Sequence, residues 1–244
     1  MSSEDFTQHI SRQFNADLEE IRTHILTMGG MVEKQVTDAV SALMEADSGM
    51  AMEVMSTEKQ INGMERQIDE ECTRIIAKRQ PAASDLRLIV AVTKANTDLE
   101  RVGDEANKIA KMAIKLSEEG SLPKGFVEVR HIGNHVSTML HQALDAFARF
   151  DVQQAVAVVR EDKEVDMEYE SAMRQLVTFM MEDPRYIRRV LNVLWSLRAL
   201  ERIGDHSRNI AEQVIYLVKG LDVRHMSIKT MEEEGLFSGR GDGI

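Results

Sequence analysis

The chain lacks the features that mark secreted and membrane proteins. It contains one cysteine, Cys72, so no intramolecular disulfide can form, and we expect a cytoplasmic location. No apolar run approaches the roughly 20 residues that a membrane-spanning helix requires. The first residues, Met1 to Asp5, also lack the basic segment and apolar core of a signal peptide.

Proline, aromatic residues and net positive charge are also scarce. Three prolines in 244 residues leave room for long uninterrupted helices, and the 43% of apolar residues suffices for a core although only 5% of residues are aromatic. The formal net charge is −11. Non-specific nucleic-acid binding needs a basic surface, so we exclude that class.

Signatures of common catalytic sites are absent as well. The chain has no G-x-x-x-x-G-K-[ST] phosphate loop, no G-x-S-x-G nucleophile turn and no H-E-x-x-H zinc motif. We find no paired spacing among the seven histidines on the expected helices, so His131, His135 and His141 are candidates for phosphotransfer only by residue type. The sequence therefore predicts a protein that is not an enzyme.

Helical periodicity is present instead. Apolar residues recur every three or four positions over six stretches, 14–43, 48–80, 84–116, 129–147, 152–180 and 184–219. Cys72 lies on such an apolar stripe, which predicts a buried structural thiol. Polar residues at the expected starts predict helix N-caps at Asp47 or Ser48, Ser84, Asp151 and Asp183.

The second half of the chain repeats the first. The turn at Asp47 matches the turn at Asp151, and residues 58–62 match residues 162–166, both at an offset of 104 residues. Because short turns between long helices favour up-down bundles, we predict an all-α fold of two pseudo-symmetric three-helix bundles. The predicted domains are residues 1–120 and 121–220, followed by a flexible tail, 221–244.

One signature occurs in the third helix of each half. Residues 99–110 contain Glu100 and Asp104 around Gly103, and residues 200–211 contain Glu201 and Asp205 around Gly204. Carboxylates at positions i and i+4 are stacked neighbours and repel each other by a few tenths of a kcal/mol. A glycine inside a helix costs about 1 kcal/mol relative to alanine. Both costs are kept twice, which suggests a function.

Two interpretations of the signature stay open. The carboxylates can be an ordinary solvated surface, with the glycines allowing close helix packing. Alternatively, each pair offers up to four hard oxygen ligands to a cation, which suits Mg²⁺, Mn²⁺ or iron better than structural zinc. Asp98, Glu105 and Glu212 are near in sequence, but only Glu212 shares the helical face of its pair, and His206 has no histidine counterpart in the first half.

The whole arrangement resembles the PhoU family of bacterial phosphate-transport regulators. The resemblance rests on E-R-(V/I)-G-D-x-(A/S)-x-x-I-A in both halves and on flanking stretches at residues 13–16, 27–32, 76–87 and 144–149, and it covers roughly residues 8–220. It implies a cytoplasmic negative regulator of the phosphate-starvation response that connects the transporter ATPase PstB to the sensor kinase PhoR. The resemblance also implies that the protein reaches the membrane only through these partners, forms homodimers and has no catalytic activity.

The resemblance also implies metal clusters on the repeated carboxylates. The ligands carried over are Glu100, Asp104, Glu201 and Asp205, with Mg, Mn, Fe or Zn as the ion. Two other classes of function remain as alternatives: a metal-storage or metal-dependent hydrolytic helical bundle, and a structural, chaperone-like bundle in which the signature only packs.

Overall fold

The computed structural model describes residues 12–119 and 127–236, and this part of the chain contains helices and no strands. Six long helices and two short ones follow one another: α1 Arg12–Glu45, α2 Ser48–Arg79, α3 Ala83–Glu119, α4 Val127–Arg149, α5 Val152–Glu182, the 3₁₀ turn η2 Pro184–Tyr186, α6 Ile187–Lys219 and α7 Ile228–Glu233. The predicted all-α fold with six long helices is confirmed.

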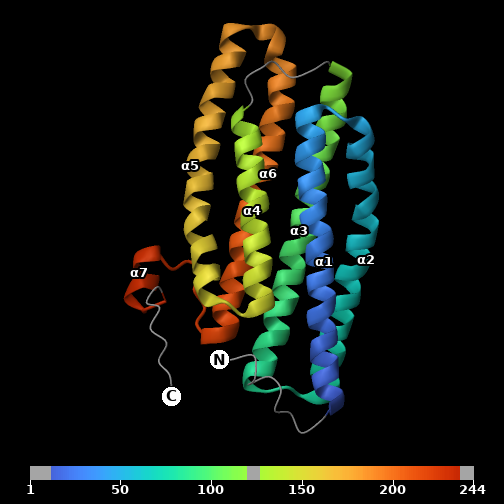
Figure 1. Cartoon of the computed structure of the whole chain (residues 1–244), viewed down its shortest axis with the longest axis vertical. Coiled ribbons are helices and arrows are strands. Elements are labelled where there is room, and N and C mark those ends of the chain that lie inside the picture. Colours follow the sequence, from blue (N-terminus) through green and yellow to red (C-terminus); the bar gives the residue numbers. More distant parts are fainter. Residues whose placement is uncertain (1–11, 120–126, 237–244) are drawn as a thin grey trace.

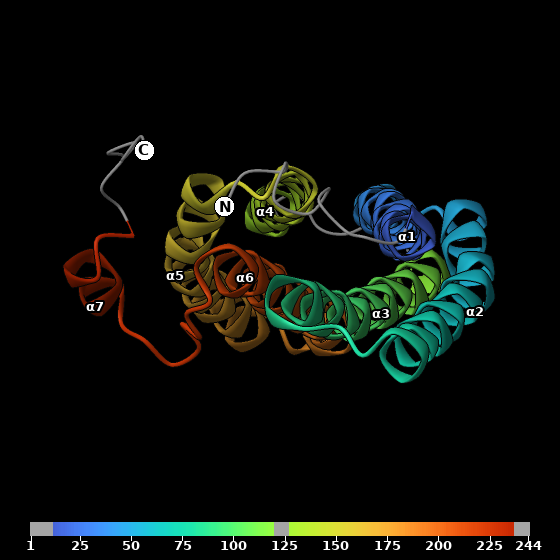
Figure 2. The same cartoon turned by 90° about the horizontal axis from the view of Figure 1, so that it is seen from below.

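The six long helices run up and down alternately and form two bundles (Figure 1). Helices α1, α2 and α3 pack together, as do α4, α5 and α6. The bundles meet where α3 lies along α6 and α1 lies beside α4 (Figure 2). The predicted pair of pseudo-symmetric three-helix bundles is therefore confirmed.

The same turn joins the first two helices of each half. Asp47 caps α2 by accepting hydrogen bonds from the backbone N–H groups of Gly49 and Met50 at 2.8 and 3.0 Å. Asp151 caps α5 in the same way, and the residue before each cap, Ala46 or Phe150, has a positive φ. Both predicted caps are confirmed, and the duplication extends to backbone conformation.

Two glycines bring the bundles into close contact. α1 passes through Gly29 without interruption, and a Cβ added at Gly29 would lie 2.6 Å from Leu144 Cδ2 of α4. A Cβ added at Gly133 would lie 2.7 Å from Val40 Cγ1 of α1. Both pairs are related by the offset of 104 residues. Gly29 and Gly133 therefore let α1 and α4 approach closely.

The predicted apolar stripes form the core, with exceptions at helix ends. Cys72 is buried as predicted, and burial raises the pKa of its thiol to about 11, which leaves it protonated and unreactive at neutral pH. Leu86 and Ile187 belong to the predicted helical stretches 84–116 and 184–219 but are exposed, because each lies in the first turn of its helix, where the bundle ends. None of the helices in the described ranges is both long and apolar enough to cross a membrane.

The helix starts and the last segment refine the sequence prediction. Asp183 caps η2 before α6, as predicted, but α3 begins at Ala83, so Ser84 lies within its first turn. Residues 221–236, expected within a tail without periodicity, contain α7, and Val223, Met231 and Leu236 are buried. Their spacing is too irregular for a helical stripe. Residues 1–11 and 237–244 lie outside the described residues.

Candidate metal centres

The second carboxylate pair lies where α6 packs on α5. Glu201 is half-buried and Asp205 reaches solvent on the next turn of α6, and the charges of Asp162 and Asp166 on α5 act on the pair. Burial and then the charge of Asp205 raise the pKa of Glu201, whereas burial and then Asp162 raise the pKa of Asp205. The pKa of Asp166 is raised by the same two causes, burial and then the charge of Asp162. The fold thus concentrates negative charge here.

The first carboxylate pair has an equivalent environment between α3 and α2. Glu100 and Asp104 are both half-buried on successive turns of α3. Burial raises the pKa of Glu100, and the charges of Asp104, Glu65 and Glu58 add to this effect. Each pair therefore faces acidic side chains of the second helix of its own half. The four predicted ligands lie as two pairs, one on α3 and one on α6.

One oxygen atom in the second cluster is buried without a hydrogen-bond donor among the described residues. Arg198 donates a hydrogen bond to Glu201 Oε1 at 2.7 Å, but Glu201 Oε2 is buried and no residue in 12–119 or 127–236 donates a hydrogen bond to it. A buried carboxylate oxygen without a partner is costly, and a bound cation would satisfy it. The donor set of oxygens on two adjacent helices fits Mg²⁺, Mn²⁺ or iron.

Glu212, the further candidate on the same face, is engaged in a different contact. Arg208 on α6 lies between two buried carboxylates: its Nη1 is 2.9 Å from Asp162 Oδ2 and its Nε is 3.1 Å from Glu212 Oε1. This bridge ties α6 to α5 and neutralises part of the charge of the second cluster. Glu212 therefore contacts Arg208, which in turn pairs with Asp162 of the cluster.

The acidic residues near the signature on α3 hold the two bundles together. Asp98 Oδ1 lies 2.8 Å from His206 Nδ1 and accepts a hydrogen bond from Asn209 at 3.0 Å, both on α6. Glu105, which is buried, pairs with Arg202 of α6 at 3.1 Å. His206 is thus occupied by a helix–helix contact, in agreement with its lack of a counterpart in the first half.

The two signature glycines face their own bundles. A Cβ on Gly103 would lie 3.1 Å from Gln35 Oε1 and 3.7 Å from Ile61, whereas a Cβ on Gly204 would lie 3.5 Å from Val165 and 3.7 Å from Val136. Both positions are buried. The signature therefore has one packed face and one carboxylate face, so packing and ligand binding are compatible.

The motifs alone do not predict the acidic residues on α2 and α5, although the sequence contains a signal for them. Residues 58–62 and 162–166 were matched as a repeat, and this repeat carries Glu58 in one half and Asp162 with Asp166 in the other. A recurring acidic residue beside a recurring carboxylate pair is evidence for a shared cluster. The sequence did not show that these helix faces meet.

The prediction that the histidines show no paired spacing on the helices is wrong. His131 and His135 are paired at i and i+4 on α4, and both contact Glu168 of α5, with Nε2 of His131 at 3.1 Å and Nδ1 of His135 at 3.2 Å from its carboxylate. His141 likewise pairs with Glu33 of α1 at 2.9 Å. The histidines of α4 are therefore used as partners for glutamates of neighbouring helices.

The fold and the site together define a class of protein: a duplicated three-helix bundle. The third helix of each half carries a pair of carboxylates at the edge of its buried face. The comparisons agree. A family model described as the PhoU domain matches residues 25–113 and 129–214. The chain therefore belongs to the PhoU family.

Individual relatives are similar over nearly the whole chain. The chain is 64% identical to the phosphate-specific transport system accessory protein PhoU homolog of Pseudomonas putida, over 96% of this chain and 91% of the relative. It is 51% identical to the phosphate-specific transport system accessory protein PhoU of Escherichia coli K12, over 93% of each.

Solved structures give the same result. The crystal structure of PhoU from Pseudomonas aeruginosa is 64% identical, with a TM-score of 0.84 over 85% of this chain and 100% of that chain. The phosphate transport system regulatory protein PhoU from Streptococcus pneumoniae is 28% identical, with a TM-score of 0.79 over 86% of this chain and 99% of that chain. The duplicated bundle is thus retained at low sequence identity.

Proposed function

We propose that this chain is a non-enzymatic, cytoplasmic accessory protein of a phosphate transport system and a negative regulator of the phosphate-starvation response. The observation that carries the proposal is full-length similarity at 64% identity to a protein named for the phosphate-specific transport system. A protein that regulates by binding its partners needs extended surfaces, and the long helices of this bundle provide them.

The proposed partners are the transporter ATPase PstB and the sensor kinase PhoR. In this scheme the protein, acting as a homodimer, holds PhoR in its phosphatase-favouring state while phosphate is ample. It reaches the membrane only through these partners. The names of the relatives support a link to the transporter, and the link to the kinase follows from the family resemblance alone.

Metal binding at the two carboxylate clusters is the second part of the proposal. Glu100 and Asp104 would hold one centre and Glu201 and Asp205 the other, with Glu58, Glu65, Asp162 and Asp166 close by. A bound cation supplies positive charge that offsets the repulsion within each cluster. The raised pKa of Glu100 and Glu201 and the unpartnered Glu201 Oε2 support this assignment.

A gene deletion tests the regulatory role. Deleting the gene is expected to raise alkaline phosphatase activity in cells grown with ample phosphate, and the wild-type gene on a plasmid should restore repression. A pull-down with PhoR and PstB at high and low phosphate then tests the partners. Full repression in the deletion strain contradicts the proposal.

Metal analysis tests the ligand assignment separately. The wild-type protein and a variant with Glu100, Asp104, Glu201 and Asp205 replaced by alanine are purified without added metal and are then equilibrated with Mn²⁺. The variant is expected to lose the bound metal of both clusters. Equal metal content in the two proteins refutes the assignment, and a variant that loses metal but still represses shows that the regulatory role does not need these centres.

A further inference from the structure

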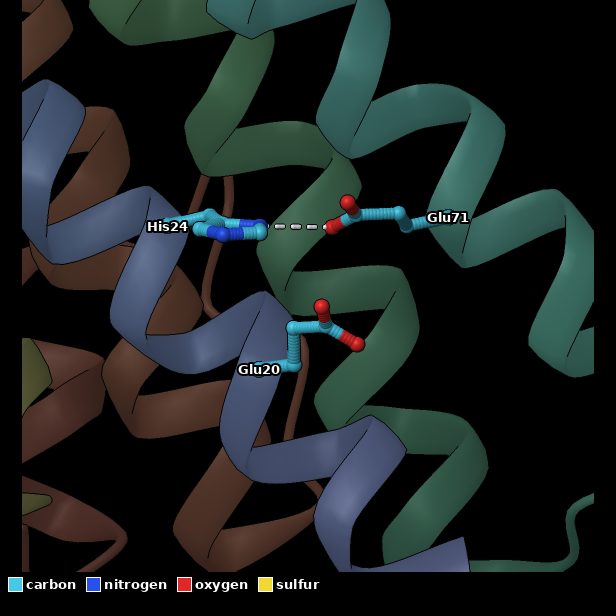
Figure 3. A group of neighbouring side chains, drawn as sticks. All are labelled: Glu20, His24 and Glu71. Carbon is cyan, nitrogen blue, oxygen red and sulfur yellow. Dashed lines mark hydrogen bonds and ion pairs between the residues drawn. The ribbon is translucent and has the colours of Figure 1, made fainter.

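A third group of metal-ligating side chains lies between α1 and α2, away from both carboxylate clusters. Glu20 and His24 lie on successive turns of α1 and point toward α2, from which Glu71 points back (Figure 3). One ligand atom from each of the three residues lies within 4.8 Å of the other two. The charges that act on Glu100 come from other residues of α2 and α3, so this group is separate.

The geometry of the pair at its centre is close to that of a metal site. His24 Nδ1 is 2.8 Å from Glu71 Oε2. Ligand atoms of a tetrahedral zinc site are about 3.3 Å apart, because each lies about 2.0–2.1 Å from the ion. A small separation of the two side chains would therefore make room for an ion between them.

Glu71 is positioned as an oriented ligand. Its side chain is only 10% exposed, and its other oxygen, Oε1, accepts a hydrogen bond from Gln67 Nε2 at 2.9 Å. Carboxylate ligands of metals are usually held in this way by outer hydrogen bonds, which fix the oxygen that faces the ion. Gln67 lies one turn earlier on α2, so the helix itself orients Glu71.

Glu20 is the third ligand and has no competing partner. Among residues 12–119 and 127–236, no hydrogen bond or ion pair holds its carboxylate. Glu20 is exposed and lines a hollow of about 410 Å³, so an ion bound here has access from solvent. Neither His24 nor Glu71 lines this hollow, so Glu20 is the residue through which the group reaches solvent there.

We propose that Glu20, His24 and Glu71 bind one divalent transition-metal ion, which we infer to be zinc, and that this ion ties α1 to α2. Imidazole together with carboxylate ligands suits zinc, whereas the clusters on α3 and α6 offer oxygen ligands that suit harder ions. The proposal is independent of the proposed regulatory function.

Other histidine–glutamate contacts of the chain serve as internal controls. His141 and Glu33 form a pair of similar length, 2.9 Å, and no third ligand completes it in the described residues. His131 and His135 share Glu168, but these three residues do not bring one ligand atom each within 4.8 Å of the other two, as Glu20, His24 and Glu71 do in the described part of the chain. A histidine–glutamate ion pair alone therefore predicts no zinc binding at either place.

Zinc titration of the full-length protein tests the proposal. Excess Mg²⁺ is present to occupy the carboxylate clusters, and a competing chromophoric chelator reports the zinc stoichiometry. His24→Ala and Glu71→Gln are each expected to lower the number of bound zinc ions by one. His141→Ala and His135→Ala are expected to leave it unchanged. An unchanged stoichiometry in His24→Ala overturns the proposal, as does an equal loss in His141→Ala.

Two milder variants guard against a folding defect. Glu20→Gln changes an exposed side chain, and Gln67→Leu removes the hydrogen bond that orients Glu71, so both should fold and bind zinc at least about tenfold more weakly. In histidine-labelled wild-type protein, the ring ¹⁵N signals of His24 should shift first on addition of zinc. Wild-type affinity in Glu20→Gln, or first shifts at His131 and His135, contradict the proposed site.

Discussion

The two halves of the molecule share a backbone plan and differ in how they balance charge. In the second half, Arg208 bridges Asp162 and Glu212, and Arg198 bonds Glu201. The residue of α3 that corresponds to Arg208 is Asn107, a buried side chain whose amide oxygen and nitrogen have no hydrogen-bond partner in the part of the chain that the structure describes. Within the described residues, no ion pair reaches Glu100 or Asp104.

This difference shows that the repeat fixes the place of the carboxylates and not their neutralisation. The second cluster has arginines of α6 in direct ion pairs, whereas in the first the charge of Arg101 acts on Glu100 without an ion pair. A cation should therefore matter more for the first cluster. The following experiments on metal-free protein break or sharpen this contrast between halves.

Removal of the bridging arginine should give the largest effect. Arg208→Met leaves Asp162 and Glu212, which are 3% and 4% exposed, without their counter-charge. Breaking a buried charge pair in this way costs about 3 kcal/mol of unfolding free energy. Urea unfolding followed by circular dichroism measures the change. Arg198→Met is the matched control: Arg198 is about half exposed and pairs with a single carboxylate, so its loss should cost less than the loss of Arg208, on the order of 1 kcal/mol.

Equal losses in the two arginine variants would remove the distinction between the halves. They would show that Arg208 stabilises the fold no more than a half-exposed arginine does, and that its bridge between Asp162 and Glu212 is not a buried counter-charge.

The glycines between α1 and α4 should give the next effect. A Cβ at Gly133 meets Val40, whose branched side chain has one preferred rotamer in a helix, while a Cβ at Gly29 meets the more adaptable Leu144. Overpacking of this kind costs about 1–3 kcal/mol. Gly133→Ala is therefore expected at the upper end of this range and Gly29→Ala at the lower end, measured by urea unfolding. The reverse order would show that the α4 side of the contact is the stiffer one.

The pH dependence of stability should separate the two clusters by charge. Burial is the main cause that raises the pKa values of Glu201, Asp205 and Asp166 in the folded protein. The folded state therefore binds protons at these groups more tightly than the unfolded chain does. This contribution is fully present below the ordinary pKa values, 4.5 for Glu and 3.8 for Asp, and is lost as the pH rises through the raised values.

The unfolding free energy of the metal-free protein is measured from pH 4 upward, in pH increments of about one unit. Asp166→Asn with Asp205→Asn should flatten the fall in stability, and more so than Glu100→Gln, since more raised carboxyl groups lie in the second half. Differences between variants cancel the opposite effect of exposed Asp222, whose pKa Arg224 holds down at about 2. A steeper fall in the double variant contradicts the assignment of the raised groups.

Sequence patterns predicted what depends on local periodicity. The six helices, the caps at Asp47, Asp151 and Asp183 and the burial of Cys72 follow from spacing and from side-chain chemistry near in sequence. The position of each carboxylate pair at the edge of an apolar stripe was also accessible, because the stripe fixes which face of the helix turns inward.

The rest depends on how one helix is rotated about another. The reach of Arg208 to Asp162, the contact of His206 with Asp98 and the convergence of His131 and His135 on Glu168 each join residues of different helices. Periodicity gives the buried face of a helix but not the neighbour that its flanking polar residues meet. The packing of residues 221–236 was missed because it rests on a few apolar residues without a period.

The smallest effect concerns the signature glycines and decides what they are for. A Cβ at Gly204 would make ordinary contacts of 3.5 and 3.7 Å with valines. Gly204→Ala should therefore raise the unfolding free energy by about 0.5–1 kcal/mol, since alanine removes the entropic cost of glycine in a helix.

Gly103→Ala should gain less, within about 0.5 kcal/mol of zero, because the new methyl group lies 3.1 Å from Gln35 Oε1. Gln35 is buried and its amide donates a hydrogen bond to the Val54 carbonyl, so it can yield only a little. Urea unfolding of both variants at equal m-value measures the contrast. A loss of stability in Gly204→Ala would mean that α6 tolerates no added methyl group. A gain there means that packing alone does not require glycine beside Asp205, which leaves the carboxylate face as the reason for the signature in this half.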